Sequence, residues 1–213
     1  MEKWRDAGMM HNDSQAAYRD RVRVAPGGPL RQRNPYGRRP GWSGLGDAMK
    51  GVGKFGEVLA GEKGKVSYDA VAERLDKIIS SGSQKKAITD FVCRELRKIP
   101  HYTWVGIYEV QGNELALTSW SGPSATQHVR IPVGQGICGA AVTAKETVVV
   151  PDVSRDPRYL QCFLNTNSEI VVPILKEGVA VAEIDIDSDQ LGAFGPTDTE
   201  FLTWVAGGLA GIL

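Results

Sequence analysis

Residues 104–120 decide the fold, and they read Trp-Val-Gly-Ile-Tyr-Glu-Val-Gln-Gly-Asn-Glu-Leu-Ala-Leu-Thr-Ser-Trp. Two runs rich in β-branched and aromatic residues flank Gln111-Gly112-Asn113, a pattern typical of two antiparallel strands joined by a short turn. In the first strand, Trp104 and Tyr108 are an even number of positions apart, so they lie on the same side. The stretch therefore predicts a β-hairpin with an aromatic face.

The segments around this hairpin alternate between helical and strand-like patterns. A helix is predicted over residues 67–79 with Ser67 as its N-cap, and a second amphipathic helix ends at Pro100 and holds Cys93 in the core. The remaining predicted elements are strands at residues 129–131, 147–150, 170–175 and 179–186, a short helix from Gly136 and a closing helix over residues 198–213. Helices at both ends and a meander of strands between them predict an α+β domain with an antiparallel sheet.

The first 65 residues differ in composition from the rest of the chain. They carry 13 Lys and Arg against 7 Asp and Glu, whereas residues 66–213 carry 12 against 18. Residues 19–42 hold seven arginines among Pro and Gly, and such a segment buries too little apolar surface to offset its ordering entropy. We expect a basic, disordered tail over residues 1–65 and a folded domain over residues 66–213. The tail is either a solvated extension, a segment upstream of a true start at Met49, or a contact for RNA, a membrane or an acidic partner.

Composition also argues against several classes of protein. A chain of 213 residues with 42% hydrophobic and 23% charged residues is typical of a soluble globular protein. No stretch approaches 18 consecutive apolar residues, so no membrane span is expected. The N-terminus lacks the apolar segment of a secretory signal, and we expect a cytoplasmic protein whose three cysteines are thiols at rest. The acidic charge of the folded part argues against a nucleic-acid partner.

Cys138 and Cys162 are the candidate redox residues. Cys138 falls in the first turn of the short helix, where amide N–H groups and the helix dipole lower a thiol pKa, whereas apolar burial raises it. The sequence leaves both outcomes open. Cys162 lies in a polar loop over residues 152–167, and loops on a rigid scaffold often carry function. The pair indicates either redox chemistry on a small polar ligand or an accident of packing.

Carboxylates alternate along the stretch Glu183-Ile184-Asp185-Ile186-Asp187. In a strand this pattern puts three acids on one face and two isoleucines, in the core, on the other. Three like charges in a row raise one another's pKa unless a cation lies among them. The segment is either a solvated edge strand or a binding surface for the amino group of a small ligand, with Trp104 and Tyr108 as an aromatic wall.

Three further patterns fail on their context. Residues 134–139 spell a dinucleotide-binding fingerprint, but no βαβ alternation surrounds them. Residues 185–189 resemble the start of a calcium loop, but its glycine and its closing glutamate are missing. The three histidines have no metal-ligand spacing with the cysteines. We therefore expect no metal and no cofactor.

Four stretches of the chain carry a family resemblance: residues 102–108 (Tyr-Thr-Trp-Val-Gly-Ile-Tyr), 130–139 (Arg-Ile-Pro-Val-Gly-Gln-Gly-Ile-Cys-Gly), 168–173 (Ser-Glu-Ile-Val-Val-Pro) and 185–188 (Asp-Ile-Asp-Ser). They are similar to GAF domains and, more narrowly, to the free methionine-(R)-sulfoxide reductases of that superfamily. The resemblance covers about residues 68–213. It implies a GAF-like antiparallel sheet flanked by N- and C-terminal helices, in a homodimer.

The resemblance also implies a role for each candidate residue. The matched positions are Cys162 for the nucleophile, Cys138 for a resolving cysteine, Glu169, Asp185 and Asp187 for carboxylates that hold the substrate and its sulfoxide oxygen, and Trp104 and Tyr108 for the aromatic wall. The implied chemistry is attack of a thiolate on the sulfoxide sulfur while a carboxylic acid protonates the oxygen. The sulfenic acid then condenses to a disulfide, which a thioredoxin-type reductant clears.

Two positions depart from the family pattern. Many members of the reductase branch carry a third cysteine two residues before the Arg-Ile-Pro triplet, where this chain has His128. Glu183 adds a charge where an apolar residue is expected. Two rival functions therefore stand beside the reductase: a non-enzymatic GAF sensor that binds a small metabolite through a site with redox-sensitive cysteines, and a docking module that acts through the basic tail.

Overall fold

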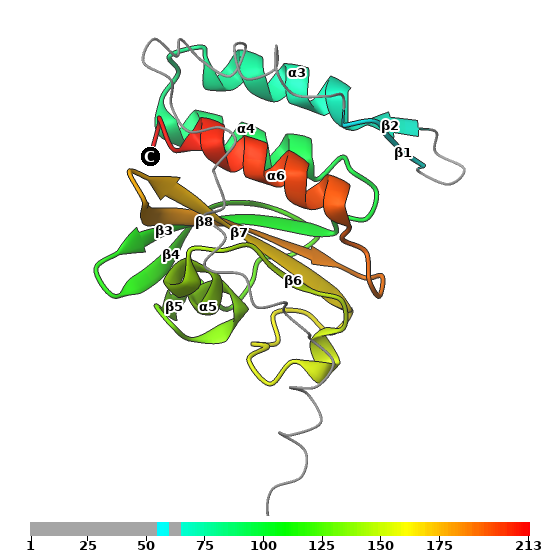
Figure 1. The fold of residues 1–213 in the computed structure, drawn as a ribbon, viewed down its shortest axis with the longest axis vertical. Helices are drawn as coiled ribbons and strands as arrows, with labels where there is room; N and C mark the ends of the chain where they lie inside the picture. The colour runs from blue at the N-terminus through cyan, green and yellow to red at the C-terminus, as the bar shows by residue number, and fades with distance from the viewer. Residues whose placement is uncertain (1–54, 60–64) are drawn as a thin grey trace, which may run out of the picture. The chain divides into compact units, whose positions relative to one another are not determined.

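The computed structural model describes residues 55–59 and 65–213. The elements follow in the order β1 (Glu57–Leu59), β2 (Lys65–Ser67), α3 (Tyr68–Ile79), α4 (Lys85–Leu96), β3 (Trp104–Gln111), β4 (Glu114–Ser121), β5 (Arg130–Pro132), α5 (Gly136–Ala144), β6 (Val148–Val150), the short 3-10 helix η2 (Val153–Arg155), β7 (Ser168–Lys176), β8 (Val179–Ser188) and α6 (Pro196–Leu209) (Figure 1). The predicted α+β class and the predicted order of elements are confirmed.

One antiparallel sheet organises the domain, and its strand order is β5-β4-β3-β8-β7-β6. The predicted hairpin is β3 and β4, and its two strands pair in register from Val105 with Ser121 to Gln111 with Glu114, with one irregularity on the way. The last two strands, β7 and β8, also pair with each other, and β8 continues the sheet by pairing with β3. Thus β3 and β8 lie at the centre of the sheet.

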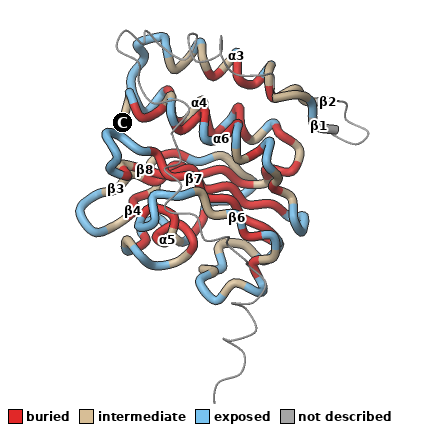
Figure 2. The backbone as a smooth tube through the Cα atoms, viewed as in Figure 1, coloured by how far each residue is buried: buried red, intermediate tan, exposed pale blue. Residues whose placement is uncertain are grey.

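The two faces of the sheet are covered by different layers. On one face α4 packs on β3 and β4, α6 packs on β7, and α3 covers both helices (Figure 1). On the other face α5 packs against β7 and β8. Alternate residues of each central strand therefore enter different cores, and β3, β7 and β8 are buried along most of their length (Figure 2).

The first and last helices are joined by a buried polar contact. Asp198, in the first turn of α6, accepts hydrogen bonds from the Tyr68 hydroxyl (2.6 Å) and the Tyr102 hydroxyl (2.8 Å), and its second oxygen accepts one from the Gly195 amide (2.8 Å). The predicted start of the closing helix was Asp198, but α6 begins at Pro196 because proline is well suited to the first turn. The predicted cap of the first helix is confirmed, since the Ser67 hydroxyl accepts from the Ala70 amide.

Part of the predicted tail has a defined structure. Strand β1 pairs with β2, and the Phe55 ring contacts the rings of Phe201 (centroids 5.3 Å apart) and Trp204 (5.9 Å). Residues 1–54 and 60–64 lie outside the described residues, so the disorder expected for the tail stays a prediction. None of the helices in the described part of the chain combines the length and the apolar character that crossing a membrane requires.

Candidate functional site

Three carboxylates of β8 lie on the sheet face that α5 covers. Glu183, Asp185 and Asp187 are 0%, 3% and 2% exposed, while Ile184 and Ile186 enter the opposite core beneath the helices. The predicted alternation is therefore confirmed. The alternative of a solvated edge strand is wrong, because β8 is a central strand with partners on both sides.

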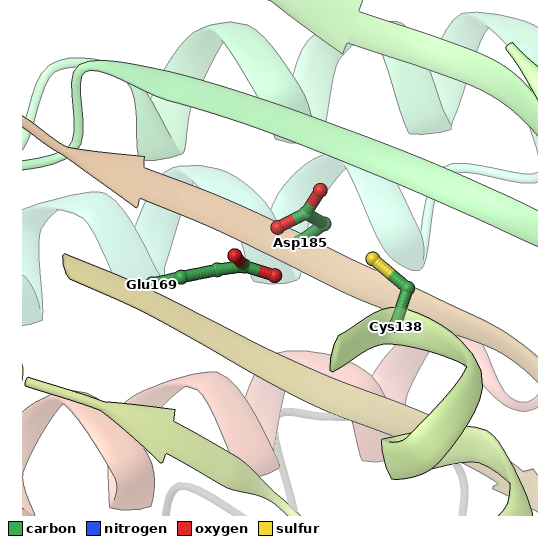
Figure 3. A group of neighbouring side chains, drawn as sticks. All are labelled: Cys138, Glu169 and Asp185. Atoms are coloured by element: carbon green, nitrogen blue, oxygen red, sulfur yellow. The ribbon is translucent and has the colours of Figure 1, made fainter. Parts of the chain in front are cut away.

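Neighbouring elements bring a fourth carboxylate and a thiol to the same place. Glu169 of β7 is the register partner of Asp187, and Cys138 lies on α5. One ligand atom from each of Cys138, Glu169 and Asp185 lies within 4.8 Å of the others. Figure 3 shows the sulfur and the two carboxylates turned toward one another. We name this group, Cys138, Glu169 and Asp185, the thiol–carboxylate cluster.

Two glycines allow α5 to approach the sheet with Cys138 in its first turn. Gly136 has a positive φ of 71° where the chain turns into the helix. At Gly139 a Cβ would lie 2.7 Å from the Gly134 amide nitrogen, so the helix and the preceding turn pack too closely for any side chain there. These residues fix the height of the Cys138 thiol above β7 and β8.

The Cys138 thiol is buried, and burial decides the direction in which its pKa shifts. Burial raises the pKa of the Cys138 thiol well above its usual range, and the charges of Asp185, Glu183 and Glu169 raise it further. The helix N-terminus would favour the thiolate, but it is outweighed here. In the resting protein Cys138 is therefore a protonated thiol.

Cys162 reaches the same carboxylates from the loop between η2 and β7. The thiol is partly buried and donates to the Leu160 carbonyl at 3.4 Å. Burial raises the pKa of Cys162, the charges of Asp185 and Asp187 raise it further, and a contact with the Thr126 side chain lowers it. Negative charge on Cys162 in turn raises the pKa of Cys138. The two thiols thus lie near the same carboxylates, and ionisation of Cys162 makes ionisation of Cys138 harder.

The four carboxyl groups of the site tend to keep their protons. Burial raises the pKa values of Glu169, Glu183 and Asp185 well above their usual range, and neighbouring carboxylates add to the effect. Burial raises the pKa of Asp187 to about 7, although a hydrogen bond with Thr166 lowers it. Asp187 is thus the group of this site that can both hold and release a proton near neutral pH.

Several oxygens of these groups are buried without a hydrogen-bond partner in the described structure. They are both carboxyl oxygens of Glu183, Oδ1 of Asp185 and Oδ2 of Asp187. Buried polar atoms are nearly always satisfied in folded proteins. The unpartnered oxygens therefore point to a site built to receive a positively charged or hydrogen-bonding ligand.

Two aromatic side chains of β3, which we call the aromatic wall, border the carboxylates on the same face of the sheet. Trp104 and Tyr108 of β3 are 2% and 0% exposed and belong to the same core cluster as Cys138. The Trp104 indole lies over two glycines, since a Cβ at Gly106 or Gly122 would lie 2.3 Å or 2.2 Å from its ring atoms. The ring also contacts Phe163 of the Cys162 loop, with centroids 5.8 Å apart. The wall therefore joins the sheet to the loop that carries Cys162.

His128 bridges the two loops around the site. Its backbone carbonyl accepts from the Tyr108 hydroxyl at 3.0 Å, and its ring Nε2 lies 3.2 Å from the carbonyl of Gln161, the residue before Cys162. The position at which many members of the branch carry a third cysteine thus lies beside the Cys162 loop.

The sequence did not indicate some residues that shape the site. Thr126 and Thr166 contact Cys162 and Asp187 from loops, where no periodic pattern exists to reveal them. Gly106 did carry a signal, because a glycine within a strand often marks close approach of another group. The sequence does not show that Cys138, Glu169 and Asp185 lie this close together, since they lie on three separate elements.

Comparisons with known proteins agree with this fold. The family model of the GAF domain matches residues 83–213. GAF domain-containing protein A of Dictyostelium discoideum is 32% identical over 150 residues, which cover 70% of this chain and 93% of that protein. The free methionine-R-sulfoxide reductase of Saccharomyces cerevisiae is 40% identical over 107 residues, 48% of this chain and 58% of that protein. The chain thus spans somewhat more than half the length of the yeast relative.

Solved structures give the same result. The structure of free methionine-R-sulfoxide reductase from Neisseria meningitidis in complex with its substrate matches with a TM-score of 0.65 and 32% identity, over 68% of this chain and 87% of that one. The GAF-like sheet and the resemblance to free methionine-R-sulfoxide reductases, both expected from the sequence, are confirmed. With more than half of its length matched by the family model, this chain belongs to the GAF domain family.

Proposed function

We propose that this protein reduces free methionine-R-sulfoxide, with Cys162 as the nucleophile and Cys138 as the resolving thiol. The observation that carries the proposal is the convergence of two thiols and four buried carboxyl groups on one face of β7 and β8. The relatives named free methionine-R-sulfoxide reductase support the same reaction class.

The protonated amino group of the substrate supplies a positive charge that would stabilise the buried carboxylates. Glu169 and Asp185 lie buried on adjacent strands, and an ammonium group beside them favours their ionised forms, while Asp187 keeps its proton for the sulfoxide oxygen. Trp104 and Tyr108 offer an apolar wall for the side chain that carries the sulfoxide. A free amino acid fits this arrangement better than a residue within a peptide, whose amide nitrogen carries no charge.

The reaction then proceeds in two balanced steps. The Cys162 thiolate attacks the sulfoxide and takes its oxygen as a sulfenic acid, and the sulfoxide is reduced by two electrons to the thioether. We assign to Asp187, whose pKa burial raises to about 7, the protonation of the oxygen as it leaves sulfur. The Cys138 thiol then attacks the sulfenic sulfur, water leaves, and a disulfide joins Cys138 and Cys162.

A thioredoxin-type dithiol returns the enzyme to its starting state. Its two thiols reduce the disulfide by exchange and are themselves oxidised to a disulfide. We also propose, with the family, a cytoplasmic homodimer in which residues 1–65 take no part in the reaction.

The raised thiol pKa values favour one alternative, a non-enzymatic sensor. Burial and the neighbouring carboxylates oppose thiolate formation at both Cys138 and Cys162. A sensor needs only the carboxylate and aromatic surface and binds a small ammonium-bearing metabolite without turnover. The reductase requires the bound ammonium to offset the carboxylates and so to lower the thiol pKa values when substrate arrives.

Turnover in a thioredoxin-coupled assay distinguishes the two functions. The wild type is expected to consume free methionine-R-sulfoxide repeatedly, Cys162→Ser to be inactive, and Cys138→Ser to release about one methionine per protein before it stops. Cys93→Ser is the matched control, because Cys93 lies in the opposite core beneath the helices. An inactive wild type would refute the reductase, and activity in Cys162→Ser would refute the assigned nucleophile.

A further inference from the structure

The thiol–carboxylate cluster has the composition of a metal site, although no histidine belongs to it. Its ligand atoms are one sulfur and two carboxylate oxygens, supplied by α5, β7 and β8, and they lie within 4.8 Å of one another (Figure 3). Ligands of a tetrahedral zinc ion lie about 3.3–3.7 Å apart, as metal bonds of about 2.0–2.3 Å require. Side-chain rotations that shorten the longest separation by about 1 Å would close the cluster on an ion.

Glu183 gives an independent indication of a cation at this place. Its carboxyl group is fully buried, neither of its oxygens has a hydrogen-bond partner in the described structure, and it contacts the Cys138 thiol. The Oδ1 atom of Asp185 is also unpartnered. Buried carboxyl oxygens without a partner are costly even when the group is protonated, and a cation that displaces the proton would satisfy them.

We propose that the thiol–carboxylate cluster binds a single divalent transition-metal ion, zinc above all, through Cys138, Glu169 and Asp185, with Glu183 as a supporting carboxyl group beside Cys138. A thiolate with carboxylates suits zinc better than calcium or magnesium, which favour oxygen ligands alone. Binding displaces the proton of Cys138 and those held by the carboxyl groups that coordinate. No electron is transferred.

The consequence for activity rests on the proposed function. Zinc would occupy the carboxylates that hold the substrate ammonium and would keep Cys138 as a bound thiolate, unable to resolve a sulfenic acid. It would therefore act as a reversible inhibitor that competes with methionine sulfoxide. Oxidation of Cys138 to the disulfide would in turn abolish metal binding, because the ligand is consumed.

Metal binding is measured directly, without reference to turnover. Reduced, full-length protein is titrated with Co²⁺ and followed by the thiolate-to-cobalt charge-transfer absorption, and Zn²⁺ affinity is obtained by competition. We expect one ion per chain in the wild type and in the control Cys93→Ser. We expect Zn²⁺ affinity at least tenfold lower in Asp185→Asn and in Glu183→Gln, since loss of even a supporting group costs about 10–100-fold.

Cys138→Ser is the decisive variant. It is expected to lose the charge-transfer absorption, while circular dichroism and the Tm report whether the fold is kept. Absorption that is absent from the wild type, or that persists in Cys138→Ser, overturns the metal site. Because no substrate is present, either result is independent of whether the protein proves to be a reductase. Competition by methionine-R-sulfoxide then tests the overlap of the two sites.

Discussion

Asp187→Asn is expected to stabilise the ligand-free protein at alkaline pH and to lose this advantage in acid. Asp187 is 2% exposed, and burial raises its pKa from 3.8 to about 7, against the lowering effect of Thr166. The folded pKa lies above the unfolded one, so the native state binds the extra proton. Protonation of Asp187 therefore contributes to the free energy of unfolding. This contribution is complete below the pKa of the unfolded state and is lost as the pH rises through about 7, the pKa of the folded state.

The size of the effect follows from the shift. A difference of about three pH units corresponds to roughly 4 kcal/mol at about 1.36 kcal/mol per unit. Between pH 5 and pH 8 the unfolded carboxyl is already ionised while the native one titrates, and this interval accounts for about 3 kcal/mol. An asparagine cannot ionise, so the wild type should lose this amount relative to the variant. For a domain of this size that is roughly 6–12 °C in Tm.

Urea unfolding at pH 5 and at pH 8, with a chelator to exclude metal ions, measures the difference. The control is Asp189→Asn, an exposed carboxylate two residues further along the chain. The quantity to compare is the free energy of unfolding of Asp187→Asn minus that of the wild type at each pH. If this difference is the same at both pH values, or larger at pH 5, Asp187 does not hold a proton in the native protein and the assignment of the proton donor is wrong.

Three other substitutions probe the site and the opposite core of the domain. Gly106→Ala brings a Cβ to 2.3 Å from the Trp104 ring, so we expect a shifted tryptophan emission, a raised KM and a loss of about 1–3 kcal/mol of stability; an unchanged KM would contradict the role of the aromatic wall. His128→Cys places a thiol beside Gln161, and peptide mapping after oxidation should find it linked to Cys162; its absence would separate this position from the Cys162 loop. Asp198→Asn should cost roughly 2–3 kcal/mol at neutral pH, because the carboxylate accepts hydrogen bonds from Tyr68 and Tyr102. Burial alone would raise the pKa of Asp198, but hydrogen bonds with His101, Gly195 and Tyr68 lower it, so this stabilisation is present above the unfolded pKa and should fade in acid; a cost that does not shrink at low pH would argue against an ionised Asp198.

The sequence predicts the fold well wherever the information is local. The alternation of Ile184 and Ile186 with carboxylates decides which side of β8 faces which core, because strand periodicity needs only neighbouring residues. The same pattern does not tell a solvated edge strand from a buried central one. That distinction depends on β3 and β7 pairing on either side, which is a long-range property.

The site shows the same limit. Cys138, Glu169 and Asp185 come from three elements, and only the packing of α5 against β7 and β8 brings them together. The pKa of the Cys138 thiol could have moved either way from the sequence, since a helix N-terminus and burial oppose each other there. In the structure the effect of burial is the larger one, and the pKa of Cys138 is raised. The pairing of β1 with β2 was not predicted for a similar reason. The segment has no periodic pattern, and the contact of Phe55 with Phe201 of α6 joins residues that are far apart in the sequence.

A single turnover tests the central claim most directly. Reduced protein is mixed with free methionine-R-sulfoxide in the absence of any other reductant, the methionine released is counted, and the cysteines are mapped by mass spectrometry. We expect about one methionine per chain and a disulfide between Cys138 and Cys162, with Cys93 still a thiol. Release of no methionine, or release with Cys138 and Cys162 both left as thiols, would contradict the account.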